Sequence, residues 1–201
     1  MKLQKNIRIT KKDNVGCHPT LSDFEPTFKK TKRGYEVILF EGSYKSSKHN
    51  HSVNSKIVDF ERKGRGGKNI YLLIKVDMKR WSNGARFTNG YYTGYWLIGH
   101  DDGSDFVTRL PNKDFKTIDE ALEYMKPAVV KKAEKEGKKV FRQGDVFFIE
   151  ASKRTNIFKQ HLPASHKIGE DLVVRHGEHS ALKLPHPHFK VALRKALSDN
   201  D

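Results

Sequence analysis

The chain has 201 residues and carries 39 Lys and Arg side chains against 24 Asp and Glu, a formal charge of +15 at pH 7. No apolar run approaches the roughly 20 residues of a membrane span, and the single cysteine cannot form an internal disulfide. We therefore expect a soluble, intracellular protein of one domain or two small ones, without membrane contact, whose charge favours nucleic acid as its polyanionic partner.

Residues 1–33 form a basic arm or tail in our interpretation. The segment is rich in Lys, Thr, Pro and Asp, and its last cations are Lys29, Lys30, Lys32 and Arg33. The first predicted strand, residues 35–40, has β-branched and aromatic side chains and lies between two glycines. We predict a polar loop over residues 43–54, where Ser, Asn and Lys dominate.

A glycine-rich link joins two predicted strands, residues 56–61 and 69–77, and this pattern predicts a hairpin with a basic tip. The cations of the tip are Arg62, Lys63, Arg65 and Lys68. Glycines let backbone N–H groups approach an oxygen-rich ligand while the cations add charge, so we predict phosphate contact at the tip. A solvated turn is the alternative. The tip is not a Walker A loop, because Arg62 and Asn69 stand where that motif needs Gly and Ser or Thr.

Aromatic side chains follow this hairpin along the chain. Residues 91–98 and 104–110 form a second predicted hairpin around an Asp-Gly turn. Alternation along its first strand places Tyr92 and Trp96 on one face and Tyr91 and Tyr95 on the other. One face must pack inward, and the other could stack bases. The further predicted nucleic-acid contacts are Lys79, Arg80, Trp81, Arg86, Tyr92 and Trp96. Packing of these rings in the core is the alternative.

Two short helices are predicted near the middle of the chain. Thr117 and Glu120 match a capping box, which begins a helix that runs to about residue 126. Pro127 fits the first turn of a second helix, which ends at Gly137. We therefore assign residues 34–126 to a β-rich basic domain that ends in a helix, residues 127–138 to a helical linker, and residues 139–201 to a small β-rich domain.

The last of these domains has four predicted strands, residues 146–149, 172–175, 182–184 and 189–193. Turn residues separate the strands at short intervals, and a small barrel or roll would let such strands cover one another. The predicted fold class is α+β, mainly antiparallel β with a short central helical pair.

Six of the ten histidines lie beyond residue 160. His186 and His188 would share one side of an extended segment, and His176 and His179 could converge across a turn, so these four are candidate ligands for zinc or iron. No recognised zinc spacing is present, and histidines without a metal or other cofactor are the simpler expectation. No spacing among the carboxylates or serines indicates a catalytic site, so we expect a binding protein rather than an enzyme.

The C-terminal part contains the segment Arg142-Gln143-Gly144-Asp145-Val146, with Leu162-Pro163 and Gly177-Glu178-His179 further along the chain. It resembles a group of small uncharacterised proteins from phages and other mobile elements. These open with an Arg-Gln-Gly-Asp-Val strand and end with a Gly-Glu-x-x-Gly-His-x-His segment. This chain has His179-Ser180-Ala181 in place of the Thr-Gly-His continuation. The resemblance implies a viral or mobile-element setting and a small β-rich C-terminal domain, and it implies no activity.

Together these patterns predict a protein that binds RNA or DNA mainly through phosphates, as a ribonucleoprotein subunit or a viral or mobile-element accessory protein. The predicted contacts are the hairpin tip and the cations of residues 29–33. Two alternatives stay open. One is a metal-dependent nuclease or hydrolase that uses the C-terminal histidines, and the other is a protein-binding module or inhibitor with a basic face.

Overall fold

The computed structural model describes residues 7–13, 20–45, 49–64, 68–82 and 90–194. Over these residues the fold is mostly β with two α-helices, which is consistent with the α+β class. The described chain divides into two compact units. Unit 1 contains the residues up to His100 together with Asp105–Ala121, and unit 2 contains Asp101–Ser104 and the chain from Leu122 onward.

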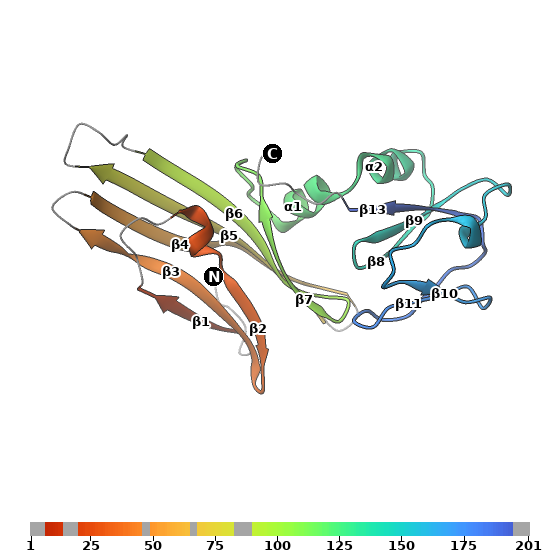
Figure 1. Ribbon diagram of the computed structural model, residues 1–201, viewed down its shortest axis with the longest axis horizontal. Helices are drawn as coiled ribbons and strands as arrows, with labels where there is room; N and C mark the ends of the chain where they lie inside the picture. Colours follow the sequence, from red (N-terminus) through yellow and green to blue (C-terminus); the bar gives the residue numbers. More distant parts are fainter. Residues whose placement is uncertain (1–6, 14–19, 46–48, 65–67, 83–89, 195–201) are drawn as a thin grey trace. The chain divides into compact units, whose positions relative to one another are not determined.

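A seven-stranded sheet carries most of the residues of unit 1 (Figure 1). Its strand order is β1-β3-β4-β5-β6-β7, and β2 also pairs with β3. The strands are β1 (Ile7–Lys12), β2 (Thr27–Thr31), β3 (Gly34–Lys45), β4 (His49–Lys63), β5 (Asn69–Ser82), β6 (Gly90–Asp101) and β7 (Ser104–Leu110). The pairing of β1 with β3 is parallel, whereas β2 to β3, β3 to β4, β4 to β5 and β5 to β6 are antiparallel. The long strands therefore present two broad faces.

One face of this sheet carries the core of unit 1. Alternate residues of β5, from Ile70 to Met78, are buried there with Val53 and Trp96. Phe24, from a 3₁₀ turn over Leu21–Phe24, packs edge-on against Phe40. Burial of apolar side chains at about 25 cal/mol per Å² makes this layer the main stabilising element of the unit.

The helices are α1 (Ile118–Met125) and α2 (Ala128–Lys135). The predicted capping box is confirmed at α1, because the Glu120 N–H donates to Thr117 Oγ1 and the Glu120 carboxylate accepts from the Thr117 N–H. In unit 2, Val130 and Ala133 of α2 form a cluster with Phe147 and Ile149.

Unit 2 contains two open three-stranded sheets. The first has the order β13-β9-β8, with β8 (Val140–Gln143), β9 (Val146–Glu150) and β13 (Phe189–Leu193), and the second has the order β10-β11-β12, with β10 (Lys167–Ile168), β11 (Val173–Arg175) and β12 (Leu182–Lys183). Phe148 and Phe189 of the first share a core with Val174 of the second. Neither described sheet closes on itself, so the predicted barrel or roll is not confirmed.

One expectation for the N-terminal half needs correction. The predicted loop over residues 43–54 is largely strand, because β3 extends to Lys45 and β4 begins at His49. The described part of the predicted basic arm or tail contributes β1 and β2 to the sheet. Within the described residues, no helix combines the length and the apolar character needed to cross a bilayer.

Candidate functional site

The predicted basic tip does not gather its cations on one surface. Lys63 lies on one face of the β4–β5 hairpin, where its ammonium contacts Glu61 at 2.8 Å and also pairs with Asp119. Burial alone would lower the pKa of Lys63, but its hydrogen bonds to these two carboxylates raise it. Arg62 lies on the opposite face, half-buried and in register with Ile70. Lys68 is exposed, and Arg65 lies outside the described residues.

The cations of residues 29–33 are exposed at the β2–β3 turn. Lys29 pairs with Glu36 at 3.4 Å, and Glu36 also accepts a hydrogen bond from Thr10. The hydrogen bond from Thr10 lowers the pKa of Glu36 most, and Lys29 lowers it further. Lys32 and Arg33 line a hollow of about 460 Å³ with Arg8, a cation that the sequence analysis missed. Only the parallel pairing of β1 with β3 brings Arg8 to this place.

The uncovered part of the large sheet gathers polar side chains on one side, in contrast to the hairpin tip. Directly opposed residues of antiparallel strands point to the same side. Tyr91, Lys79 and Ser52 form one such row across β6, β5 and β4. The neighbouring rows on this side complete the set that we call the polar face: Glu41, Ser43, Lys45, Asn50, Ser52, Asn54, Lys56, Lys75, Asp77, Lys79, Trp81, Tyr91 and Thr93. Of this set, Asn50 is buried.

Positive charge exceeds negative charge on the polar face. Its four lysines face two carboxylates of the set, and both carboxylates already have a lysine partner. A third carboxylate, Asp114, lies beyond the end of the set: its hydrogen bond from Tyr95 lowers its pKa most, and Lys116, Lys75 and Lys56 lower it further. Glu41 pairs with Lys11 of β1, and Asp77 pairs with Lys75 at 3.3 Å and accepts a hydrogen bond from Thr93 at 2.7 Å. The three lysines that remain, Lys45, Lys56 and Lys79, are exposed.

The other end of this side of the sheet is closed by β7 and the segment after it. Phe115 packs edge-on against Tyr95 at 5.8 Å between ring centroids, and Phe106 lies against Tyr71. The Tyr95 hydroxyl donates to Asp114 at 2.6 Å. Burial, together with this carboxylate, raises the pKa of Tyr95. The polar face therefore ends at a hydrophobic boundary.

The structure separates the predicted aromatic residues by face. The alternation along β6 is confirmed, because Tyr92 and Trp96 are in register with Met78 and Ile74 of the core side. Trp96 is fully buried, so the expectation that it stacks on bases is wrong. Tyr92 and Arg80 also lie on the core side, whereas Trp81 and Lys79 lie on the polar face. Arg86 lies outside the described residues.

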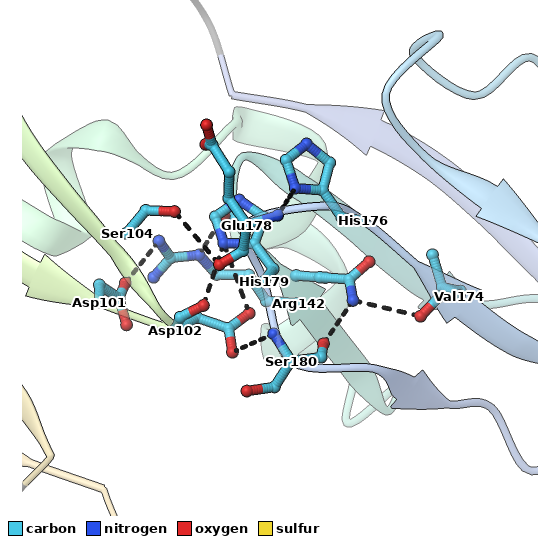
Figure 2. A network of polar contacts seen from close by, with 11 residues as sticks. Asp101, Asp102, Ser104, Arg142, Val174, His176, Glu178, His179 and Ser180 are labelled. Atoms are coloured by element: carbon cyan, nitrogen blue, oxygen red, sulfur yellow. Dashed lines mark hydrogen bonds and ion pairs between the residues drawn. The ribbon is translucent and has the colours of Figure 1, made fainter.

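A cluster of three imidazoles occupies unit 2. The ring of His176 lies 4.4 Å from that of His179 and 4.5 Å from that of His166. Figure 2 shows the backbone N–H of Glu178 donating to Nδ1 of His176, a bond of 3.0 Å that places the proton of neutral His176 on Nε2. Nδ1–H of His179 donates to the Asp102 carbonyl at 3.1 Å. Burial lowers the pKa of His166 most, and the nearby His176 lowers it further.

The other two predicted ligands lie in a different setting. Nε2–H of His186 donates to Glu150 at 3.2 Å and its ring stacks on Phe189, while Nδ1–H of His188 donates to the Thr155 carbonyl at 2.9 Å. His166, which the sequence analysis did not select, takes their place beside His176 and His179. Across the described chain, no group of three or more His, Cys, Asp or Glu side chains has an arrangement that could hold a metal.

The two halves of the C-terminal sequence pattern meet in this cluster. The Gln143 amide is buried and donates to the carbonyls of Val174 and Ser180. Gly144 has a φ of +57°, and a Cβ there would come within 2.2 Å of Nε2 of His179. Nε–H of Arg142 donates to the Gly144 carbonyl. The same guanidinium pairs with Asp101 (Figure 2). The contacts that Arg142, Gln143 and Gly144 make within unit 2 therefore explain these three residues of the pattern.

Comparison of the chain with protein-family models, with curated proteins and with solved structures found no match.

Proposed function

We propose that this protein binds RNA or DNA through the polar face, with the exposed ammonium groups of Lys45, Lys56 and Lys79 on the phosphates. The observation that supports this most is the row Ser52, Lys79 and Tyr91, which puts an exposed cation, a hydroxyl and an exposed ring side by side across three strands. Phosphate contacts position a nucleic acid, and polar side chains next to them reach sugars and base edges.

The charge of the chain supports a polyanionic partner. A net charge of +15 raises the local concentration of nucleic acid and favours release of its counterions on contact. The tip of the β4–β5 hairpin contributes less than expected, because Lys63 is already neutralised by two carboxylates. Lys32, Arg33 and Lys68 are exposed and add secondary phosphate contacts in this proposal. An intracellular setting, where nucleic acid is abundant, is part of the proposal.

The slope of log K against log salt tests the proposal. A triple variant, Lys45→Gln, Lys56→Gln and Lys79→Gln, is compared with a control of equal charge change, Lys135→Gln, Lys153→Gln and Lys159→Gln, whose lysines are exposed in unit 2. With about 0.7 unit of slope for each lost phosphate contact on a single strand, the first variant should flatten the slope by about 2. The control should change it much less, and Lys63→Gln should leave it nearly unchanged.

Two results would contradict the proposal. Equal flattening by both triple variants would mean that binding follows net charge alone and not the polar face. Competition by polyglutamate as effective as competition by the nucleic acid, at equal charge concentration, would favour an acidic protein surface as the partner.

A further inference from the structure

We infer that the polar face takes single-stranded nucleic acid, with bases stacked on Tyr91 and Trp81. This inference rests on the proposed function and adds the class of substrate. Tyr91 carries the inference first: its side chain is 70% exposed even though the residue lies within β6. The other two tyrosines on this side of the sheet, Tyr71 and Tyr95, are 4% and 2% exposed under Phe106 and Phe115.

Trp81 adds a second ring on the same face. Trp81 lies two residues beyond Lys79, the cross-strand partner of Tyr91. Such diagonal neighbours are roughly 7–8 Å apart between Cα atoms, within the reach of aromatic side chains. Nζ of Lys79 lies 5.6 Å from the Trp81 ring centroid, so a cation is held beside this ring by the residue that is directly opposite Tyr91 in the sheet. A nucleotide on Tyr91 would have its phosphate next to this ammonium.

The geometry favours unpaired bases. A ring on a broad sheet contacts the flat face of a base, and in a duplex that face is covered by the neighbouring base pairs. Bases of a single strand are free to stack on exposed rings, which needs no particular sequence because every base has a π face. Asn54 and Ser52 lie on the same face, and their side chains can hydrogen-bond to base edges or sugars. We therefore expect weak sequence preference.

Tryptophan fluorescence gives a specific readout. The chain has two tryptophans, and Trp96 is fully buried in the core, so quenching by a bound base reports on Trp81. The probes are a single strand of about 12 thymidines, an abasic strand of equal length and a duplex of the same length. The inference predicts quenching and tight binding with the ordinary strand, and weaker binding without quenching for the other two. Trp81→Phe should abolish the signal.

The variant test uses two neighbouring tyrosines. Tyr91→Ala should weaken binding of the ordinary strand by about fivefold or more, from the usual contribution of one stacked base, and should leave binding of the abasic strand unchanged. Tyr92→Ala is the matched control, because Tyr92 lies on the core side of β6. Tyr91→Leu keeps an apolar side chain without a π system, and it should behave like Tyr91→Ala.

The outcomes separate this inference from the proposed function. Equal affinity for ordinary and abasic strands, or no effect of Tyr91→Ala and Tyr91→Leu, would overturn stacking while salt-dependent binding through the lysines could still stand. Tighter binding of the duplex than of the single strand would also overturn it. Absence of salt-dependent binding to all three probes would overturn the proposed function as well.

Discussion

His166 shows how one buried side chain can make stability depend on pH. It is 8% exposed, and burial and the neighbouring His176 and His179 lower its pKa, whereas the main chain of Gln143 and the carboxylate of Asp145 oppose this effect. Other charged groups near the cluster are Asp102, Glu178 and Arg142, which pairs with Asp101 (Figure 2). The folded state therefore binds a proton less readily than the unfolded state, and its stability depends on His166 being neutral.

The sign of the pH dependence follows from linkage. Above the ordinary histidine pKa of about 6.5, both states have neutral His166 and stability is highest. As pH falls from there towards the lower pKa of the folded state, the unfolded state binds more protons and the free energy of unfolding decreases. Urea unfolding between about pH 8 and pH 5 should show this decrease, and His166→Gln should reduce it. His161→Gln, which changes an exposed histidine of unit 2, should not. Parallel pH profiles of all three proteins would contradict this account.

The faces of the aromatic residues were only half predictable. Alternation along β6 follows from the period of two of any strand, so the separation of Tyr91 from Tyr92 and Trp96 could be read from sequence. Which face becomes the core could not, because it depends on where the 3₁₀ turn at Leu21–Phe24 and the segment around Phe115 pack. The sequence analysis therefore selected Trp96, which is buried, and put less weight on Tyr91.

At the scale of elements, local signals were predictable and long-range contacts were not. The capping box at α1 involves residues three apart and was identified from sequence. The same helix also receives a cap from Asp59 of β4, whose carboxylate accepts the Ile118 N–H at 2.9 Å, and no local pattern indicates this partner. The end of β3 and the start of β4 were interpreted as loop because Ser and Asn are typical of turns, but in this sheet Ser43, Ser52 and Asn54 lie on the polar face.

The turn between β8 and β9 supplies a prediction at this scale. Gly144→Ala should destabilise unit 2 for two reasons: its φ of +57° is unfavourable for alanine, and the new Cβ would meet the His179 ring. Gly137→Ala is the matched control, because Gly137 has a φ of +71° with no atom within 4 Å of the added Cβ. The control should lose about 1 kcal/mol from backbone strain alone, and Gly144→Ala should lose clearly more. The free energies of unfolding in urea measure the difference, and equal losses would exclude a contribution from the contact with His179.

At the scale of the whole molecule, the pattern of predicted strands and helices indicated the α+β class, but it did not indicate the architecture of the C-terminal part. The structure divides the chain near Ala121, within α1, and assigns α2 and the turn Asp101–Ser104 to unit 2. The strands of unit 2 have two to five residues each. They form two open sheets that share one core. The predicted positions of these strands did not indicate how the strands pair, because pairing depends on long-range contacts such as those of Gln143 with Val174 and Ser180.

The most direct test of the central claim is the position of the bound strand on the chain. A thymidine strand of about 12 nucleotides that carries photoreactive 4-thiothymidine would be cross-linked to the protein, and the attached peptides identified by mass spectrometry. The account predicts cross-links in β5 and β6 at Trp81 and Tyr91, which salt suppresses. Cross-links concentrated in unit 2, or spread evenly over both units, would contradict it.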